Sequence, residues 1–240
     1  MKNKKIIFRP LSEMTQEITP TPKPSKSEIP KWYKNLKRYY NSPETKDVSI
    51  NFFNDKTAKT CVPMLDSMTC GYYYTLPYDL LCLYDKNGAR YVSWGDKHTE
   101  YIGTHSIEQI GEYPIPEGYE NCILKINTTW GVQTPPGYSL LYMHPLGRFD
   151  LPFYSFHGLV DSDVFYKNMN MPIVLKRGFE GVIKQGTPIS QLIPIKRDRW
   201  KSEQKKFNEK EYNPSIDNLM TLITMEKWYM NNRWIKKQYD

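Results

Sequence analysis

Long apolar runs are missing from this chain of 240 residues. No segment approaches the roughly 18 consecutive apolar residues that a membrane-spanning helix needs. Behind the basic start only Ile6–Phe8 is apolar before Arg9, which is too short for the apolar region of a signal peptide. We therefore expect a soluble, intracellular protein that does not enter a membrane.

Cysteine and histidine are scarce, with 4 residues of each. The cysteines form no C-x-x-C pair, and no histidine stands near them at the spacing of zinc ligands. The sequence therefore excludes the common zinc modules and favours reduced cysteines with a structural role. These are Cys61, Cys70, Cys82 and Cys122.

The net charge of +7 is unevenly distributed along the chain. Residues 1–40 carry +7 and residues 196–240 carry +4, which leaves −4 for the residues between them. A mildly acidic centre with basic ends can meet nucleic acid, an acidic protein or an anionic membrane, although most charged runs are simply hydrated. The charge distribution alone does not identify a partner.

The N-terminal region is rich in proline. Five prolines between residues 10 and 30 argue against a helix or a sheet ladder and predict an extended arm. The arm leads into residues 31–40, where Trp32, Leu36 and Tyr39 recur at helical spacing on a basic background. This short helix is predicted either to dock on a partner or to pack on the protein's own core.

Short β-prone runs fill the middle of the chain, and its 19 tyrosines suit strand faces that are half packed and half wet. Asp85–Gly88 is the clearest hairpin signal, because Asn-Gly tolerates the positive φ angles of a tight turn. Residues 49–101 are predicted to form a β-meander, and further strands follow. The runs are 48–53, 71–76, 80–84, 90–94, 122–126, 138–143, 173–175 and 189–195.

The C-terminal region predicts a long amphipathic helix. Asn213 and Pro214 suit the N-cap and the first helical position, and apolar residues from Ile216 to Trp234 follow at helical spacing. A helix of about six turns is expected. Trp228 and Tyr229 lie off the main apolar stripe, so this helix is predicted to have two neighbours.

Three motifs in the middle of the chain resemble the trimeric dUTPase and dCTP deaminase family. The motif at 130–138 resembles the family's glycine-led strand and Pro-Gly-Tyr corner, and that at 158–163 its Gly-hydrophobic-Ile-Asp-x-Asp hairpin. Residues 186–193 resemble its Gly-x-x-Ile-Ala-Gln-Leu strand. The resemblance covers 121–196 and implies a dUTPase-like antiparallel β-sandwich that assembles as a trimer.

The resemblance also implies catalytic residues, of which the chain keeps few. Asp161 takes the place of the aspartate that orients water in these enzymes, and Arg148 lies one place from their phosphate-binding Arg-Ser pair. The expected tyrosine after Asp163 is replaced by Val164, and the glycine-rich closing tail is missing. A glutamate and an Arg-Ser pair in register for dCTP deaminase are missing too, as is the H-x-E and P-C-x-x-C signature of zinc deaminases.

Other candidate sites rest on weaker patterns. His144 and His157 flank the central loop and are candidates for a metal or acid–base site, with Asp150 or Asp161 as the carboxylate partner. The alternative is that they form local hydrogen bonds. Cys61 and Cys70 lie on either side of Asp66, where packing is favoured over an activated thiol.

We therefore predict a non-catalytic homotrimer that acts as a structural or protein-binding subunit, with no cofactor. Residues 59–72 and 29–33 also resemble, more loosely, uncharacterised tailed-bacteriophage proteins, which implies other phage or virion proteins as partners and the host cytoplasm or the virion as location. The alternatives are a nucleotide hydrolase that uses Mg²⁺, Asp161 and Arg148, and a nucleic-acid-binding protein that uses the basic ends. The predicted interface residues are Trp32, Tyr33, Leu36, Trp228, Tyr229 and Trp234.

The expected organisation has three parts. Residues 1–47 form a basic arm with a short helix, and 48–197 form the β-domain. Residues 198–240 form a linker and the C-terminal helix. The fold class is mainly β, with helix largely at the two ends.

Overall fold

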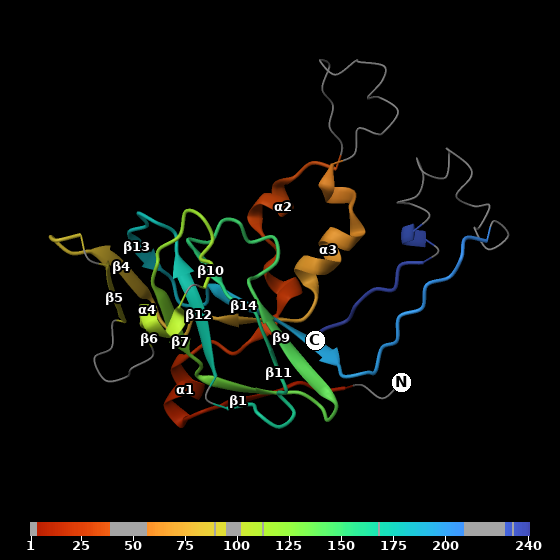
Figure 1. Ribbon diagram of the computed structural model, residues 1–240, viewed down its shortest axis with the longest axis horizontal. Helices are drawn as coiled ribbons and strands as arrows, with labels where there is room; N and C mark the ends of the chain where they lie inside the picture. The colour runs from red at the N-terminus through yellow and green to blue at the C-terminus, as the bar shows by residue number, and fades with distance from the viewer. Residues whose placement is uncertain are drawn as a thin grey trace, which may run out of the picture. The chain divides into compact units, whose positions relative to one another are not determined.

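The computed structural model describes residues 4–38, 57–88, 90–94, 102–111, 113–167, 169–208, 229–231 and 233–240 (Figure 1). The chain forms two compact units, which are described separately. The sheet unit comprises residues 1–27 and 71–197, and the second unit comprises residues 28–70 and 198–240. The predicted three-part division at 47/48 and 197/198 stays a prediction.

The sheet unit is built from antiparallel strands, which confirms the predicted mainly β class. The larger sheets have the orders β11-β9-β14-β3-β2 and β10-β12-β7-β6, and the smaller ones are β13-β4-β5 and β1-β8. The strands are β1 (Ile7–Pro10), β2 (Lys23–Pro24), β3 (Tyr72–Thr75), β4 (Leu80–Tyr84), β5 (Arg90–Trp94), β6 (Ile102–His105), β7 (Ile123–Asn127), β8 (Trp130–Gln133), β9 (Tyr138–Met143), β10 (Phe153–Ser155), β11 (Gly158–Val160), β12 (Asn170–Leu175), β13 (Gly181–Ile183) and β14 (Pro188–Lys196).

The described sheets share one apolar core. Buried side chains from β3, β4, β7, β9, β12 and β14 form a single cluster, in which Ile126, Leu140, Ile173 and Leu192 are fully buried. β14 lies between β9 and β3, and its first five residues are all buried. The apolar residues Ile189, Leu192, Ile193 and Ile195 make this strand recognisable in the sequence, although Ser190 and Gln191 interrupt the run.

The turn at Asp85–Gly88 forms as predicted. It joins β4 to β5, and the Gly88 N–H donates to the Asp85 carbonyl at 2.9 Å. Gly88 has a φ of +78°, which a residue with a side chain adopts at a cost. The run at 48–53 lies outside the described residues.

The prediction of an extended proline-rich arm is wrong. Within residues 10–30, Pro10 ends β1 and α1 (Glu13–Ile18) follows, after which Pro24 ends β2. Both strands lie at sheet edges, where the missing proline N–H costs no ladder hydrogen bond. The Thr15 N–H donates to Ser12 Oγ at 3.0 Å and so caps α1, a helix start that the prolines obscured.

The described secondary structure of the second unit is helical. It contains α2 (Lys31–Asn35), the short 3-10 helix at Ala58–Thr60 and α3 (Val62–Thr69). α3 lies inside the region expected to be a β-meander. Pro63 stands in its first turn, where no intrahelical N–H is needed, and Val62 and Met68 are buried.

The predicted C-terminal helix is described only near its end, because residues 209–228 lie outside the described residues. Residues 229–231 are helical, but 234–240 are not, so the helix ends before Trp234, the last residue of the predicted apolar stripe. The Trp234 indole donates to Asp66 Oδ2 at 2.9 Å, and Lys237 Nζ lies 2.7 Å from the same oxygen. Two side-chain contacts with α3 thus hold the last residues in a non-helical conformation.

Candidate functional site

The pairing of β11 with β9 positions Asp161. Val160 lies opposite Leu140, so the next residue on β11's chain, Asp161, comes beside Ser139. The Ser139 hydroxyl donates to Asp161 Oδ1 at 2.6 Å. The Asp161 carbonyl then accepts from the backbone N–H of Val164 at 3.0 Å, so Asp161 begins a tight turn.

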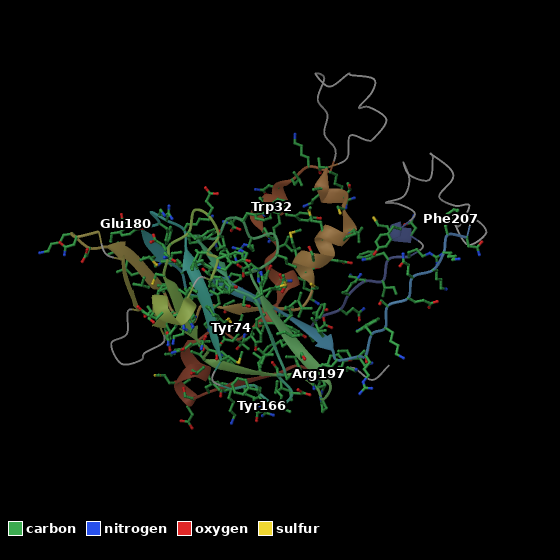
Figure 2. All side chains as sticks on the ribbon, in the orientation of Figure 1. Trp32, Tyr74, Tyr166, Glu180, Arg197 and Phe207 are labelled. Atoms are coloured by element: carbon green, nitrogen blue, oxygen red, sulfur yellow. The ribbon has the colours of Figure 1, made fainter. Side chains whose placement is uncertain are left out.

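The pairing of β14 with β9 brings an arginine to the same place. Lys196 lies opposite Tyr138, and the Arg197 N–H donates to the Gly137 carbonyl at 2.9 Å. Arg197 Nη1 donates to Asp161 Oδ1 at 3.1 Å and to Asp163 Oδ1 at 3.0 Å. Its Nη2 donates to the other oxygen of Asp163, so the guanidinium grips that carboxylate at both oxygens (Figure 2 labels Arg197).

We call Ser139, Asp161, Asp163 and Arg197 the Arg197 cluster. Its inner carboxylate is Asp163, whose side chain is 8% exposed, against 59% for Asp161. Hydrogen bonds from Arg197 and from the Gly137 N–H lower the pKa of Asp163 to about 2. The pair with Asp163 in turn raises the pKa of Arg197. Asp163 and Arg197 are therefore both charged at neutral pH, and their ion pair ties the turn to the end of β14.

Arg148 lies elsewhere in the chain's fold. It lies five residues beyond Met143, the last residue of β9, whereas Asp161 lies beside Ser139 near the start of that strand. Arg148 Nε and Nη2 donate to the two oxygens of Asp150 at 2.9 and 3.0 Å, and its side chain is 10% exposed. Within one chain the structure does not bring Asp161 and Arg148 together.

Asp150 is the partner that fixes Arg148. Burial raises the pKa of Asp150, but the hydrogen bonds and charge of Arg148 outweigh it and hold the pKa below its usual value. The backbone N–H of Leu146 donates to the buried Gln191 at 2.9 Å and fastens the same loop to β14. Arg148 is thus part of a loop anchor.

The structure brings the two predicted histidines to one tyrosine. His144 stacks on Tyr154 with ring centroids 5.2 Å apart, and the Tyr154 hydroxyl lies 2.8 Å from His157 Nε2. His144 Nδ1 accepts from the Ser155 N–H at 3.2 Å, so its proton is on Nε2, which lies 3.3 Å from the Arg148 carbonyl. Burial lowers the pKa of His144 and keeps it neutral.

These histidines make local hydrogen bonds, as the second of the two interpretations expects. No group of three or more His, Cys, Asp or Glu residues is placed to hold a metal ion in the part of the chain that the structure describes. The described residues likewise contain no disulfide, so the four cysteines are in the thiol form. None of the described helices is long and apolar enough to cross a membrane.

A pocket of about 210 Å³ opens beside these residues. Tyr142 of β9, Gly158 and Val160 of β11, and Met171 of β12 line it, with His157 at its wall. Val160 directly precedes Asp161, so the pocket and the Arg197 cluster share one strand. The lining is mainly apolar with a few polar groups, which is typical of a small-molecule site.

The predicted interface residues are distributed over the second unit. Tyr33 is 3% exposed, and Lys59 Nζ lies 4.5 Å from its ring centroid, so it packs within its own unit. Trp32, Leu36, Tyr229 and Trp234 are half-buried. Trp228 lies outside the described residues. A role in an interface stays a prediction for all of them.

Sequence reasoning missed Arg197, which completes the cluster. Asp161 and Asp163 stand out as a motif, but Arg197 meets them across 36 and 34 residues of chain. The available signal was its position directly after a predicted strand that had to pair with the strand following Gly137. A basic residue at that strand end faces the turn that carries the two aspartates.

Comparisons with known proteins give a distant likeness. No family model and no curated protein sequence matches the chain. A mutant dUTPase from phage phi11 of S. aureus superposes with a TM-score of 0.34 at 12% identity, over 85% of this chain and 96% of its own. A mutant dUTPase of Staphylococcus bacteriophage 80alpha with dUpNHpp gives 0.33 at 12% identity, over 85% and 88%. Because the likeness is so distant, the function of the site has to follow from its own residues.

Proposed function

We propose that this chain is a non-catalytic β-domain that acts as a structural or protein-binding subunit of a phage, in the host cytoplasm or in the virion. The observation that carries the proposal is the Arg197 cluster. Both aspartates of the candidate motif are hydrogen-bonded to an arginine of the same chain, which fixes the turn to β14. Both ion pairs of the cluster join the turn that carries the aspartates to the residue that follows β14.

The same contacts argue against hydrolysis. A general base needs an accessible oxygen that can hold and deprotonate water. Asp161 Oδ1 already accepts from Ser139 and Arg197, which leaves only Oδ2 of this exposed carboxylate for water. An arginine that stabilises a phosphate needs an unoccupied guanidinium edge. Arg148 instead points two of its nitrogens at Asp150 and is almost fully buried.

Turnover is the direct test of this proposal. The purified chain is incubated with dUTP or dCTP and Mg²⁺, and pyrophosphate release is measured beside Asp161→Asn as the matched variant. We expect both proteins to release no more than buffer alone. Turnover by the unmodified chain that vanishes in Asp161→Asn would replace the structural role with an enzymatic one.

The proposal also makes a claim about assembly. We propose a homotrimer, or a larger multiple, held in part by the aromatic residues of the second unit, because large aromatic side chains carry much of an interface's free energy. Removal of residues 214–240 should abolish assembly in light scattering while the β circular dichroism signal and its cooperative melting remain. A truncated chain that loses its melting transition would show instead that these residues pack on their own core.

A nucleotide hydrolase is the second candidate, and the pocket is the observation that favours it. The pocket borders Asp161 through Val160, and its mainly apolar wall with Ser155 and Asn170 suits a small ring with polar edges. Under this alternative Asp161 orients water and Mg²⁺ is the cofactor. Calorimetric titration with dUTP separates the cases, since a chain without nucleotide binding gives no saturable heat.

A further inference from the structure

The segment that follows β14 is basic, aromatic and extended. Residues 199–207 of the second unit contain four cations and one carboxylate, that of Glu203. They form neither helix nor strand, and every one of their side chains is exposed. Figure 1 draws this stretch as an extended trace after the arrow of β14. The cations are Arg199, Lys201, Lys205 and Lys206.

Two large rings stand in this segment. Trp200 is 86% exposed and Phe207 is 78% exposed (Figure 2 labels Phe207). Within the residues that the structure describes, the Trp200 side chain and the four cations make no hydrogen bond, ion pair or ring contact. A tryptophan gains about 1.5–3 kcal/mol or more when its surface leaves water, so one held in this position favours a ligand that covers it.

We propose that residues 199–207 bind single-stranded nucleic acid. Trp200 stacks on a base while Arg199 and Lys201, about 7 Å apart on an extended chain, bind the phosphates on either side. Lys205 and Lys206 continue the phosphate contacts toward Phe207, which offers a second ring. An acidic peptide supplies negative charge but no series of planar rings for stacking, whereas single-stranded nucleic acid supplies both phosphates and bases.

The affinity should depend on salt in proportion to the phosphates that are neutralised. With four cations engaged, the logarithm of the binding constant falls with a slope of about −3 against the logarithm of salt concentration. The expected loss between about 50 and 200 mM salt is therefore roughly 50-fold. Stacking adds an independent contribution, which a single ring deletion removes.

Fluorescence anisotropy of a labelled oligothymidylate with the full chain tests the proposal. We expect Trp200→Ala to weaken binding roughly tenfold or more. The double variant Lys205→Gln/Lys206→Gln should reduce the salt slope by about 1.4. The control Ile235→Ala/Lys236→Gln removes an exposed apolar residue and a cation from the same unit and should bind as the unmodified chain does.

Three results would overturn the proposal. The first is no binding of the oligothymidylate at about 50 mM salt, where electrostatic affinity is strong. The second is a Trp200→Ala variant that binds as the control does. The third is displacement of the oligothymidylate by polyglutamate at equal charge with no effect of Trp200→Ala, which would assign the segment to an acidic protein.

Discussion

Replacing Tyr74 by phenylalanine should destabilise the sheet unit through a single missing oxygen. Tyr74 lies on β3 and is 1% exposed (Figure 2). Its hydroxyl oxygen accepts from the backbone N–H of Thr129 at 2.7 Å and from that of Trp130 at 2.8 Å. Both donors belong to buried residues, Thr129 just before β8 and Trp130 at its first position, so the substitution leaves two buried N–H groups without acceptors.

The magnitude follows from the two orphaned donors. An unsatisfied buried polar group costs about 1–3 kcal/mol, and the two N–H groups share one site, so we expect a loss of about 3 kcal/mol. For a chain of this size such a loss lowers the melting temperature by roughly 6–12 °C. Urea unfolding followed by the β circular dichroism signal measures it directly.

Tyr154→Phe is the matched control. It removes the same atom, but the partner of that hydroxyl is His157, whose exposed side chain water can reach. The expected loss is below about 1 kcal/mol. If Tyr74→Phe and Tyr154→Phe unfold at the same urea concentration, Tyr74 does not satisfy the two backbone donors and the reasoning fails.

Four further substitutions probe charge, protonation and backbone conformation. Arg197→Gln should lower the urea midpoint at pH 7, and the deficit should shrink between about pH 4 and 2. The stabilisation from the depressed pKa of Asp163 is complete above the pKa of this residue in the unfolded chain, and it is lost as the pH falls through the folded pKa of about 2. The free energy of unfolding should fall less steeply below about pH 6.5 in His144→Gln than in the unmodified chain. The pKa of His144 is lower in the folded chain, so the unfolded chain takes up a proton on this residue at a higher pH and is favoured by acid. Gly88→Ala should cost about 1–2 kcal/mol in urea unfolding. Gly71→Ala should cost several times more, because its Cβ would lie 2.0 Å from a backbone oxygen of β14.

Each of these has an outcome that contradicts it. A deficit of Arg197→Gln that is unchanged at pH 2 would mean that Asp163 is not the partner through which it acts. An unaltered pH slope in His144→Gln would show that folding does not lower the pKa of His144. Equal losses in Gly71→Ala and Gly88→Ala would mean that the strand next to Gly71 moves aside without cost.

The strands that the sequence reveals are those with a strong local pattern. β4, β9 and β14 are apolar runs bounded by turn residues, and the turn between β4 and β5 carries Asn87 and Gly88. β6, β10 and β13 have only three or four residues, too few for a periodicity to show. The first two strands are hidden by proline, which favours an extended arm in the sequence but is also accepted by edge strands.

The candidate site likewise contains one part that the sequence predicts and one part that it does not. Asp161 can be recognised in the sequence because it belongs to a short motif of glycine, apolar residues and aspartates at 158–163. The partners that decide its role come from the starts and ends of other strands, and Arg197 becomes a neighbour only when β14 pairs with β9. Contacts across more than 30 residues depend on strand register, which no local pattern of this sequence specifies.

The position of Arg197 has a mechanical consequence. It is the last residue of the sheet unit, so tension on the chain that follows enters the fold through this side chain and through β14. β14 is hydrogen-bonded to β9 on one side and to β3 on the other, and a pull along it has to shear both ladders at once. The two ion pairs of Arg197 take the load first, ahead of the ladders. Force applied through residue 198 would therefore meet a shear clamp, whereas force that peels β11 from the sheet edge would break its few hydrogen bonds one after another.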